Sequence, residues 1–358
     1  AREDKLPPMM PIPPGHVRCG PLRCIPSLLQ EFGVDPVATF ATVGLDISIF
    51  DDSERPVPYE TVLALLDRAA FVTHCDYFGL LAGIRCNLED LGAVGLLAAH
   101  APTVGTALND LATNIVLFDK VTTVSLTEVR PQAHLMLSVV RSPLAASTHF
   151  LDACLAIAVR VIRQLAGETW CPGAALFPHP APVPVRPYAD FFRAPLVFGA
   201  DMAGLSFPSH WLDHPVAMHN HVMRRHLETY ISLLSHDAHA TVTDKVRSRV
   251  NRTVSFGQVS EESIARSLGM DTSTLRRRLA RENTSYRRII EDAGRERAQH
   301  LMRIPGFRLS QVAEALGYTE LSVFTRAYRR WTGMTPSEWR RQAGLTNRPI
   351  EAPIKGRS

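Results

Sequence analysis

The C-terminal third of the chain repeats one short pattern, and this repeat restricts what the region can fold into. In the second copy, an apolar stripe spaced at i, i+3, i+4 and i+7 comprises Phe324, Ala327, Tyr328 and Trp331. That spacing is typical of one face of an α-helix. A shorter amphipathic segment precedes it and ends at Gly317. A short helix, a glycine turn and a longer helix with an arginine face form a helix-turn-helix pattern.

The first copy lies 48 residues upstream and agrees in its small residue, glycine, helix core and stop. Ala265 and Gly269 match Ala313 and Gly317, and Leu275 and Leu279 take the places of Phe324 and Tyr328. Asn283 stands where Gly333 stands, and both residue types favour the left-handed conformation that ends helices. Two such patterns in tandem predict an all-α domain with two helix-turn-helix units.

The charges of the chain are sorted between its two halves. Residues 241–358 hold 23 Lys and Arg against 12 Asp and Glu, whereas residues 1–240 hold 16 against 23. A basic, duplicated helical half favours binding to a polyanion. A membrane-surface helix fits less well, because each copy needs its short apolar face for its own core.

The segment "LSQVAEALGYTELSVFTRAYRRWTGMTPSEWRR" resembles the C-terminal signature of the AraC/XylS family of transcription regulators. The matching residues include Gly317-Tyr318, the run from Phe324 to Arg330, Gly333 to Pro336, and Arg340. The resemblance implies two helix-turn-helix units joined by a helix over roughly 285–302, with successive major grooves about 34 Å apart. Arg308 stands where this family usually has a capping Ser, so we expect a frayed helix start there.

The resemblance also places two recognition helices, at 271–281 and 320–331. Candidates for contact with base edges are Thr272, Ser273, Arg276, Arg277, Glu320, Ser322, Val323 and Arg326. Arg can bind guanine through two hydrogen bonds, Glu can accept one from cytosine, and small side chains fit against a thymine methyl group. Candidates for phosphate contact, which position the protein without selecting sequence, are Arg278, Arg281, Arg329 and Arg330.

The rest of the chain predicts an α+β domain. Helices are expected at 21–32, 59–73, 88–99, 147–167 and 215–239, with another opening in 101–112 and a short one near 188–192. A hairpin is expected at 120–141, and short strands at 174–177, 196–198 and 204–207. The expected organisation is a disordered arm (1–15), a sensing or dimerisation domain (16–237), a linker (238–243), the DNA-binding domain (244–342) and a flexible tail (343–358). No membrane-spanning run is found, and six scattered cysteines favour reduced thiols in the cytoplasm.

This N-terminal half is similar to the arabinose-binding-like domain of a subgroup that includes ornithine-utilisation and mycobacterial virulence regulators. The similarity is found in the segments "LGAVGLLAAHAPTVGTALNDLA" and "FFRAPLVFGADMAGLSFPSHWLDHP". The resemblance implies a transcription activator whose partners are promoter DNA, a small-molecule effector, RNA polymerase and a second copy of the chain. The alternative is a regulator that needs no ligand and whose N-terminal half only dimerises.

An enzyme is the third hypothesis and has the least support. The segment "WCPG" around Cys171 lacks the adjacent His that a DNA-repair methyltransferase would need, and no phosphate loop or nucleophile elbow is present. Seven histidines cluster at 210–239, and the pairs His210/His214 and His219/His221 have spacings compatible with a metal. No cysteine or carboxylate completes a set, so the sequence predicts no metal site, no cofactor and no catalytic residue.

Overall fold

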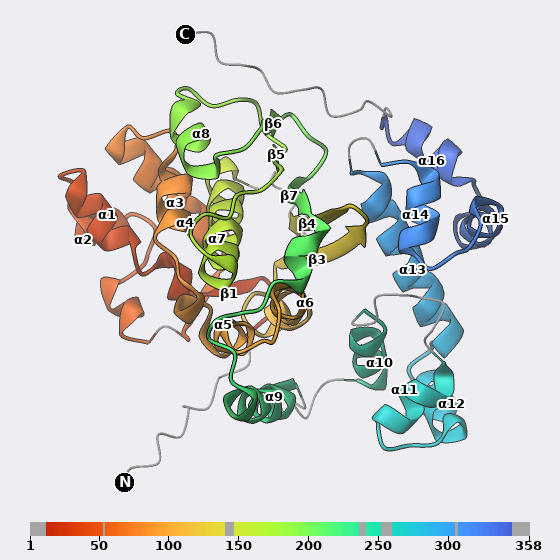
Figure 1. Ribbon diagram of the computed structural model, residues 1–358. Coiled ribbons are helices and arrows are strands. Elements are labelled where there is room, and N and C mark those ends of the chain that lie inside the picture. The colour runs from red at the N-terminus through yellow and green to blue at the C-terminus, as the bar shows by residue number, and fades with distance from the viewer. Residues whose placement is uncertain are drawn as a thin grey trace. The chain divides into compact units, whose positions relative to one another are not determined.

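The computed structural model describes residues 12–52, 54–139, 147–235, 241–251, 260–304 and 307–345. Most of the chain up to residue 237 forms one compact unit, the N-terminal unit, and the residues from 238 onward belong to a second, the C-terminal unit. The first mixes helices and strands and the second is helical (Figure 1). The predicted α+β half followed by an all-α half is therefore confirmed. Residues 1–11 and 346–358, most of the predicted arm and tail, lie outside the described residues, as do 236–240 of the predicted linker.

The N-terminal unit is built around one long helix. Its α-helices are α1 (Ile25–Glu31), α2 (Pro36–Ala41), α3 (Tyr59–Thr73), α4 (Phe78–Ile84), α5 (Gly92–Ala99), α6 (Val104–Asn114), α7 (Thr148–Ala166), α8 (Arg186–Phe192) and α9 (His221–Ser235). Short 3-10 turns are η1 (Gly20–Leu22), η2 (Ile47–Asp51), η3 (Leu88–Leu91), η4 (Ile115–Leu117) and η5 (Ser209–Asp213). Helix α7, yellow-green in Figure 1, runs through the middle of this unit and packs against α3, α4, α6, β5 and β7.

Two glycines explain how closely α4 approaches α7. A Cβ atom at Gly79 would lie 2.0 Å from the carbonyl oxygen of His149, and one at Gly83 would lie 2.4 Å from that of Ala153. Real Cβ atoms do not come this close to backbone, so only glycine permits the contact. The two residues are four apart and therefore share one face of α4. The sequence did not predict α2 or α4 as separate helices.

The larger sheet has five strands in the order β3-β4-β7-β5-β6. The strands are β3 (Thr122–Val129), β4 (Gln132–Val139), β5 (Ala174–Phe177), β6 (Leu196–Phe198) and β7 (Ala203–Pro208). β5 pairs parallel with β6 and antiparallel with β7, so Ala175 lies between Leu196 and Leu205. A separate antiparallel pair joins β1 (His16–Arg18) to β2 (Pro56–Pro58). The positions of β3 to β7 were predicted, whereas β1, β2 and the strand order were not.

A buried polar network lies between α7, α8 and the segment after β5. Asp152 is fully buried, and its Oδ1 lies 2.8 Å from His179 Nε2 while its Oδ2 accepts a 2.5 Å hydrogen bond from the Tyr188 hydroxyl. His179 Nδ1 lies 2.8 Å from the carbonyl oxygen of Pro180. Because both ring nitrogens face acceptors, the geometry suits an imidazolium that donates twice. A buried charge is tolerated only when it is paired in this way.

We expect the stability that this pair contributes to disappear as the pH rises. Burial alone would lower the pKa of His179, but the hydrogen bond and charge of Asp152 outweigh it and raise that pKa above the ordinary 6.5. Such a group stabilises the fold below its unfolded pKa and loses this contribution as the pH passes its folded pKa. The melting temperature of the N-terminal unit should therefore fall above about pH 6.5, and His179→Gln should flatten that fall.

Two other histidines, the buried His134 and the half-buried His149, serve as controls for this pH range. Burial lowers the pKa of His134 to about 4 and also lowers that of His149. Their contributions to stability are complete above the ordinary pKa of His and are lost as the pH falls. They therefore do not change how stability varies above about pH 6.5. An equally steep alkaline fall in the His179→Gln protein would contradict the assignment to His179.

The C-terminal unit consists of helices alone in its described part. They are α10 (Val242–Asn251), α11 (Glu261–Ser267), α12 (Thr272–Arg281), α13 (Tyr286–Met302), α14 (Leu309–Ala315), α15 (Leu321–Thr332) and α16 (Pro336–Gln342). The predicted repeat is visible in the backbone, because Gly269 and Gly317 have φ of 68° and 82° and Asn283 and Gly333 have φ of 56° and 79°.

The start of α14 lacks the side-chain cap that Ser would supply, since Arg308 makes no side-chain capping hydrogen bond, and the frayed start stays a prediction. The backbone N–H of Arg308 nevertheless donates to Gln311 Oε1 at 2.8 Å. The side chain at the third helical position thus supplies half of a capping box, although the cap residue is not Ser. The start of α16 is a complete capping box, since the Glu338 amide donates to Thr335 Oγ1 and Glu338 Oε2 accepts from the Thr335 amide.

The first helix-turn-helix unit has an additional helix in its core. The core cluster comprises Val246, Val250, Ile264, Ala265, Leu275, Leu279, Ile289 and Ala293. The first two of these residues lie on α10, which begins at Val242, two residues before the expected domain start at 244. The amide groups of Val242 and Thr243 donate to the Glu282 carboxylate at 2.9 and 2.7 Å. The end of the expected linker is therefore part of the helical unit.

The second helix-turn-helix unit is closed by the aromatic stripe. Phe324 and Tyr328 are fully buried, whereas Trp331 is half-buried. Trp331 packs over Gly294 of α13, where an added Cβ would lie 3.0 Å from the indole ring. The indole therefore covers the outside of the core and fastens α15 to α13.

Replacing this ring should loosen the C-terminal unit without removing a DNA contact. Trp331→Ala should lower the free energy of unfolding by about 3 kcal/mol, the lower end for Trp, because the ring is half-buried. Arg329→Ala, on the exposed face of the same helix, should change it by less than about 0.5 kcal/mol. Chemical denaturation of both proteins tests this. An unchanged midpoint with lost DNA binding in Trp331→Ala would instead place the ring in the DNA surface.

Candidate nucleic-acid interface and internal cavity

The two recognition helices expected from the sequence are α12 and α15. Asp271 and Glu320 are their N-cap residues, so both helices begin one residue after the predicted bounds. Most of the base-contact candidates are exposed, namely Ser273, Arg276, Arg277, Glu320, Ser322 and Arg326. Thr272 and Val323 are half-buried. The first turn and outer face of each helix thus present polar side chains to solvent.

Arg276 is held within the protein by a carboxylate of the neighbouring helix. Its Nε lies 2.9 Å from Glu261 Oε1, and its Nη2 lies 2.7 Å from Glu261 Oε2. This fork-to-fork geometry uses the same donors that guanine would need. Arg276 must release Glu261 before it contacts a base, so the structure favours a positioning role for it.

Arg277 and Arg326 occupy equivalent places in the two units. They are separated by 49 residues, the same interval that separates Leu279 from Tyr328 in the two cores. Both guanidinium groups are exposed, and neither has a hydrogen bond or ion pair to any residue in the described part of the chain. Among the arginines that are candidates for base contact, these two have donors that are available without breaking a contact in the described part of the chain.

The four phosphate candidates are exposed on the same two helices: Arg278, Arg281, Arg329 and Arg330. Arg330 Nε lies 3.3 Å from Glu291 Oε1, and that oxygen also accepts from Arg287 at 3.1 Å. The Glu291 carboxylate on α13 therefore positions two arginines, Arg287 on the same helix and Arg330 on α15. Because these side chains are mostly exposed, the pairs contribute little stability and can exchange for phosphate.

The glutamates that hold these arginines were not identified from the sequence. Glu261 and Arg276 are 15 residues apart on different helices, and Glu291 and Arg330 are 39 apart, so no helical spacing relates them. Arg340 is similar, because its guanidinium donates to the Phe307 carbonyl and thereby connects α16 to the start of α14. Such contacts depend on tertiary packing.

The N-terminal unit contains a cavity of about 140 Å³ that is partly open to solvent. It lies among β1, α3, α4, α6, β3, β4 and α7, and aliphatic and aromatic side chains form nearly all of its wall. The polar exceptions are Arg18, Asp119, Thr122 and the thiol of Cys154. An apolar cavity of about 150 Å³ is known to accept benzene.

The polar groups of the cavity wall differ in how they are paired. Arg18 Nη1 lies 3.2 Å from Glu54 Oε2, and its Nε donates to the Leu117 carbonyl at 3.3 Å. Asp119 Oδ1 accepts from the amides of Val121 at 2.6 Å and Thr122 at 2.9 Å. No described residue forms an ion pair with Asp119, and burial raises the pKa of its carboxyl despite these hydrogen bonds. The cavity therefore contains a buried carboxyl group without a cation.

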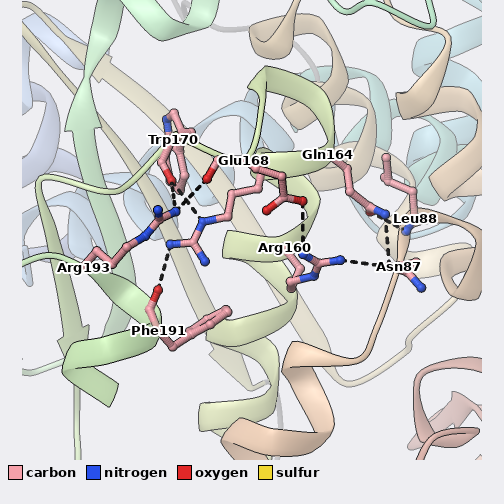
Figure 2. Close-up of polar contacts among 9 residues, drawn as sticks. Asn87, Leu88, Arg160, Gln164, Glu168, Trp170, Phe191 and Arg193 are labelled. Carbon is pink, nitrogen blue, oxygen red and sulfur yellow. Dashed lines mark hydrogen bonds and ion pairs between the residues drawn. The ribbon is translucent and has the colours of Figure 1, made fainter. Parts of the chain in front are cut away.

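Arginine contacts fix the helix that forms one wall of the cavity (Figure 2). Near the end of α7, Arg160 Nη2 and Gln164 Nε2 both donate to Asn87 Oδ1, at 3.3 and 3.1 Å. Gln164 Oε1 in turn accepts from the Leu88 amide at 2.9 Å. These bonds hold the turn before η3 against α7, and Leu91 of η3 contributes to the cavity wall.

A second group of contacts secures α8 to the same end of α7. The buried Arg163 donates to the carbonyl groups of Trp170 at 3.0 Å and Phe191 at 2.8 Å. Arg193, visible in Figure 2, donates to those of Glu168 at 2.7 Å and Trp170 at 3.2 Å. Burial, together with the nearby Arg193, lowers the pKa of Arg163 to about 10. These arginines satisfy backbone carbonyl groups and are not arranged around the cavity.

Two family models match the chain. The arabinose-binding domain of AraC transcription regulator, N-terminal, matches residues 33–216, and a helix-turn-helix domain matches residues 264–342. The chain belongs to the AraC family of transcription regulators. The predicted family and subgroup are confirmed, and this AraC-family protein is a DNA-binding transcription regulator.

Curated relatives agree over almost the full length of the chain. The chain is 27% identical over 323 residues to the HTH-type transcriptional regulator VirS of Mycobacterium tuberculosis, covering 90% of this chain and 95% of that protein. It is 26% identical over 317 residues to the ornithine utilization regulator of Pseudomonas aeruginosa, covering 87% and 93%. A solved structure, the transcriptional regulator CdpR from Pseudomonas aeruginosa, aligns with a TM-score of 0.46 at 23% identity, covering 90% of this chain and 98% of that one.

No metal site is found in the part of this AraC-family protein that the structure describes. There, no group of three or more His, Cys, Asp or Glu side chains is arranged to hold an ion. His236 and His239 of the histidine-rich segment lie outside the described residues. All six cysteines are free thiols, and of these only Cys171 is exposed. Among the described helices, none is long and apolar enough to cross a membrane.

We expect mutation to separate base contact from phosphate contact in this AraC-family protein. Arg326→Ala should lower the free energy of binding to the cognate site by about 1–3 kcal/mol and relax the sequence preference at one base pair. Arg330→Ala should weaken binding to cognate and scrambled DNA alike, because both DNAs have the same phosphates. Fluorescence anisotropy with both DNAs measures the difference. Equal losses on both DNAs for Arg326→Ala would show that this arginine does not contact a base.

Proposed function

We propose that this protein is a sequence-specific transcription activator whose DNA binding is controlled by a small molecule held in the N-terminal unit. The cavity described above carries the proposal, since it is large enough for a small ligand and is formed by helices and strands of one unit. The two basic helix-turn-helix units supply the DNA-binding half. Activation would place RNA polymerase among the partners, and the expected location is the cytoplasm.

On the DNA side, we propose that α12 and α15 enter successive major grooves. Arg277 and Arg326 would contact bases directly, since their donors are available. The other base contacts proposed are those of Thr272, Ser273, Glu320, Ser322 and Val323. Arg276 would contact a base only after leaving Glu261. Phosphate contact is proposed for Arg278, Arg281, Arg329 and Arg330.

The proposed division of labour follows the two units. Residues 16–237 would sense the effector and 244–342 would bind DNA, with α10 extending the second part to Val242. A ligand changes DNA affinity only if it binds more tightly to one of two states of the protein. A tenfold change in DNA affinity requires about 1.4 kcal/mol of such difference.

A second candidate is a regulator whose N-terminal unit only dimerises. Helix α9 favours it, because one side packs on α5 through Leu227 and Ile231 while Val222, Met223 and Leu233 are exposed by 52%, 46% and 70%. Exposed apolar side chains on one helix are typical of a protein contact. A homodimer is also compatible with effector control.

Filling the cavity tests the proposed control. Ala158 of α7 lines the cavity, so Ala158→Leu should occupy part of it and abolish the response of DNA affinity to an activating metabolite. Basal DNA affinity should stay within about twofold, because the DNA-binding half is unchanged. The matched control is Ala189→Leu on the exposed face of α8, which should respond as the unaltered protein does.

The two candidates give different results in a metabolite screen. An effector bound only by the folded protein raises its stability by about 2.7 kcal/mol at one hundred times its Kd. A protein whose N-terminal unit only dimerises would show no such rise in stability with any metabolite. Its stability would depend only on the protein concentration. In that protein, Leu233→Ser would reduce both dimerisation and DNA affinity.

A further inference from the structure

We infer that the cavity of the N-terminal unit binds a small apolar molecule that carries one cationic hydrogen-bond donor, an amine, and that Asp119 recognises this amine. The inference rests on the proposed function in one respect, namely that the cavity is the effector site. It names the chemical class of the effector and the residue that selects it.

The size and wall of the cavity determine the apolar part of the ligand. A volume of about 140 Å³ is close to that of the apolar cavity that accepts benzene, so a single ring or a short branched chain fits. Side chains such as Leu66, Leu111, Leu137 and Ile157 surround it. Contact with them favours hydrocarbon surface and leaves few places for polar groups.

Asp119 determines the polar part. Its side chain lines the cavity with only 8% exposure, and its Oδ2 has no hydrogen-bond partner among the described residues. Beside it, the Thr122 hydroxyl is buried and makes no hydrogen bond of normal geometry. A buried carboxylate with one unused oxygen and no cation is completed by a charged donor.

The same wall disfavours two other ligand classes. A carboxylate ligand would need a cation, but Arg18 is already paired with Glu54 and the Leu117 carbonyl, and Asp119 would repel it. A sugar would bring several hydroxyl groups, of which the wall could satisfy only those near Asp119 and Thr122. Each hydroxyl left without a partner in an apolar cavity costs binding free energy. The cavity therefore does not suit arabinose, although the matching family model carries that sugar in its description.

A matched probe series on the full chain tests the ligand class. Benzylamine, benzyl alcohol and benzoate share one ring and differ in the polar group, and L-arabinose represents the sugars. Calorimetric titration should rank benzylamine first and benzyl alcohol second, with no binding of benzoate or L-arabinose. Benzoate or L-arabinose binding as tightly as benzylamine, or no binding by benzylamine, would overturn the inference.

The residue is tested by Asp119→Asn, with Glu60→Gln on the exposed start of α3 as the matched control. Asp119→Asn should weaken the binding of benzylamine by at least about tenfold and that of benzyl alcohol by less than about threefold, since only the amine loses a charge-assisted hydrogen bond. Equal losses for both probes would remove Asp119 from the site. If the Asp119→Asn protein does not fold, Thr122→Val is tested in its place. Thr122→Val should weaken the binding of benzyl alcohol by about threefold or more, and unchanged binding would contradict the inference that the polar group of the ligand lies beside Asp119 and Thr122.

A separate readout distinguishes this inference from the proposed function. DNA affinity is measured with and without each probe at saturation. Benzylamine that binds through Asp119 but leaves DNA affinity unchanged would uphold the ligand class and contradict effector control. L-Arabinose that binds in the cavity and changes DNA affinity would uphold effector control and overturn the ligand class.

Discussion

The packing of α13 against both helix-turn-helix cores is the contact on which the DNA-binding half depends. Ile289 and Ala293 near its start belong to the first core, and Gly294 receives the Trp331 ring of the second unit. One helix thus fixes the relation between α12 and α15, because each packs on it through buried side chains. An α-helix does not stretch, so the distance between the two recognition helices is set by the residues of α13.

In the N-terminal unit, α7 has the corresponding role. Its contact with α4 requires glycine at positions 79 and 83, and arginine and amide contacts near its end hold the flanking turns. These constraints leave space among the elements packed around α7, and the cavity occupies that space.

Local features of the fold were predictable from the sequence, whereas long-range contacts were not. The 3.6-residue period, the left-handed residues Asn283 and Gly333, and the capping box at Thr335 are signals that neighbouring residues carry, and they gave the helices and turns of the C-terminal unit. The five-strand order brings β7 between β4 and β5, which no local pattern encodes. The pairing of Arg276 with Glu261 is likewise determined by packing. For this reason Arg276 was predicted from the sequence to be available for contact with a base. Asp119 gave no signal, since a single carboxylate before a strand is common.

If α13 holds α12 and α15 as one rigid unit, as we propose, both helices contact adjacent half-sites only when the spacing of these half-sites is correct. The affinity of the full chain for its cognate site should be measured after five base pairs are inserted between the two half-sites. This insertion turns the second half-site by about half a turn of DNA and moves it along the axis. The affinity should then fall to the level measured with scrambled DNA. An affinity within about twofold of that for the uninterrupted site would instead show that one helix-turn-helix unit alone selects the sequence.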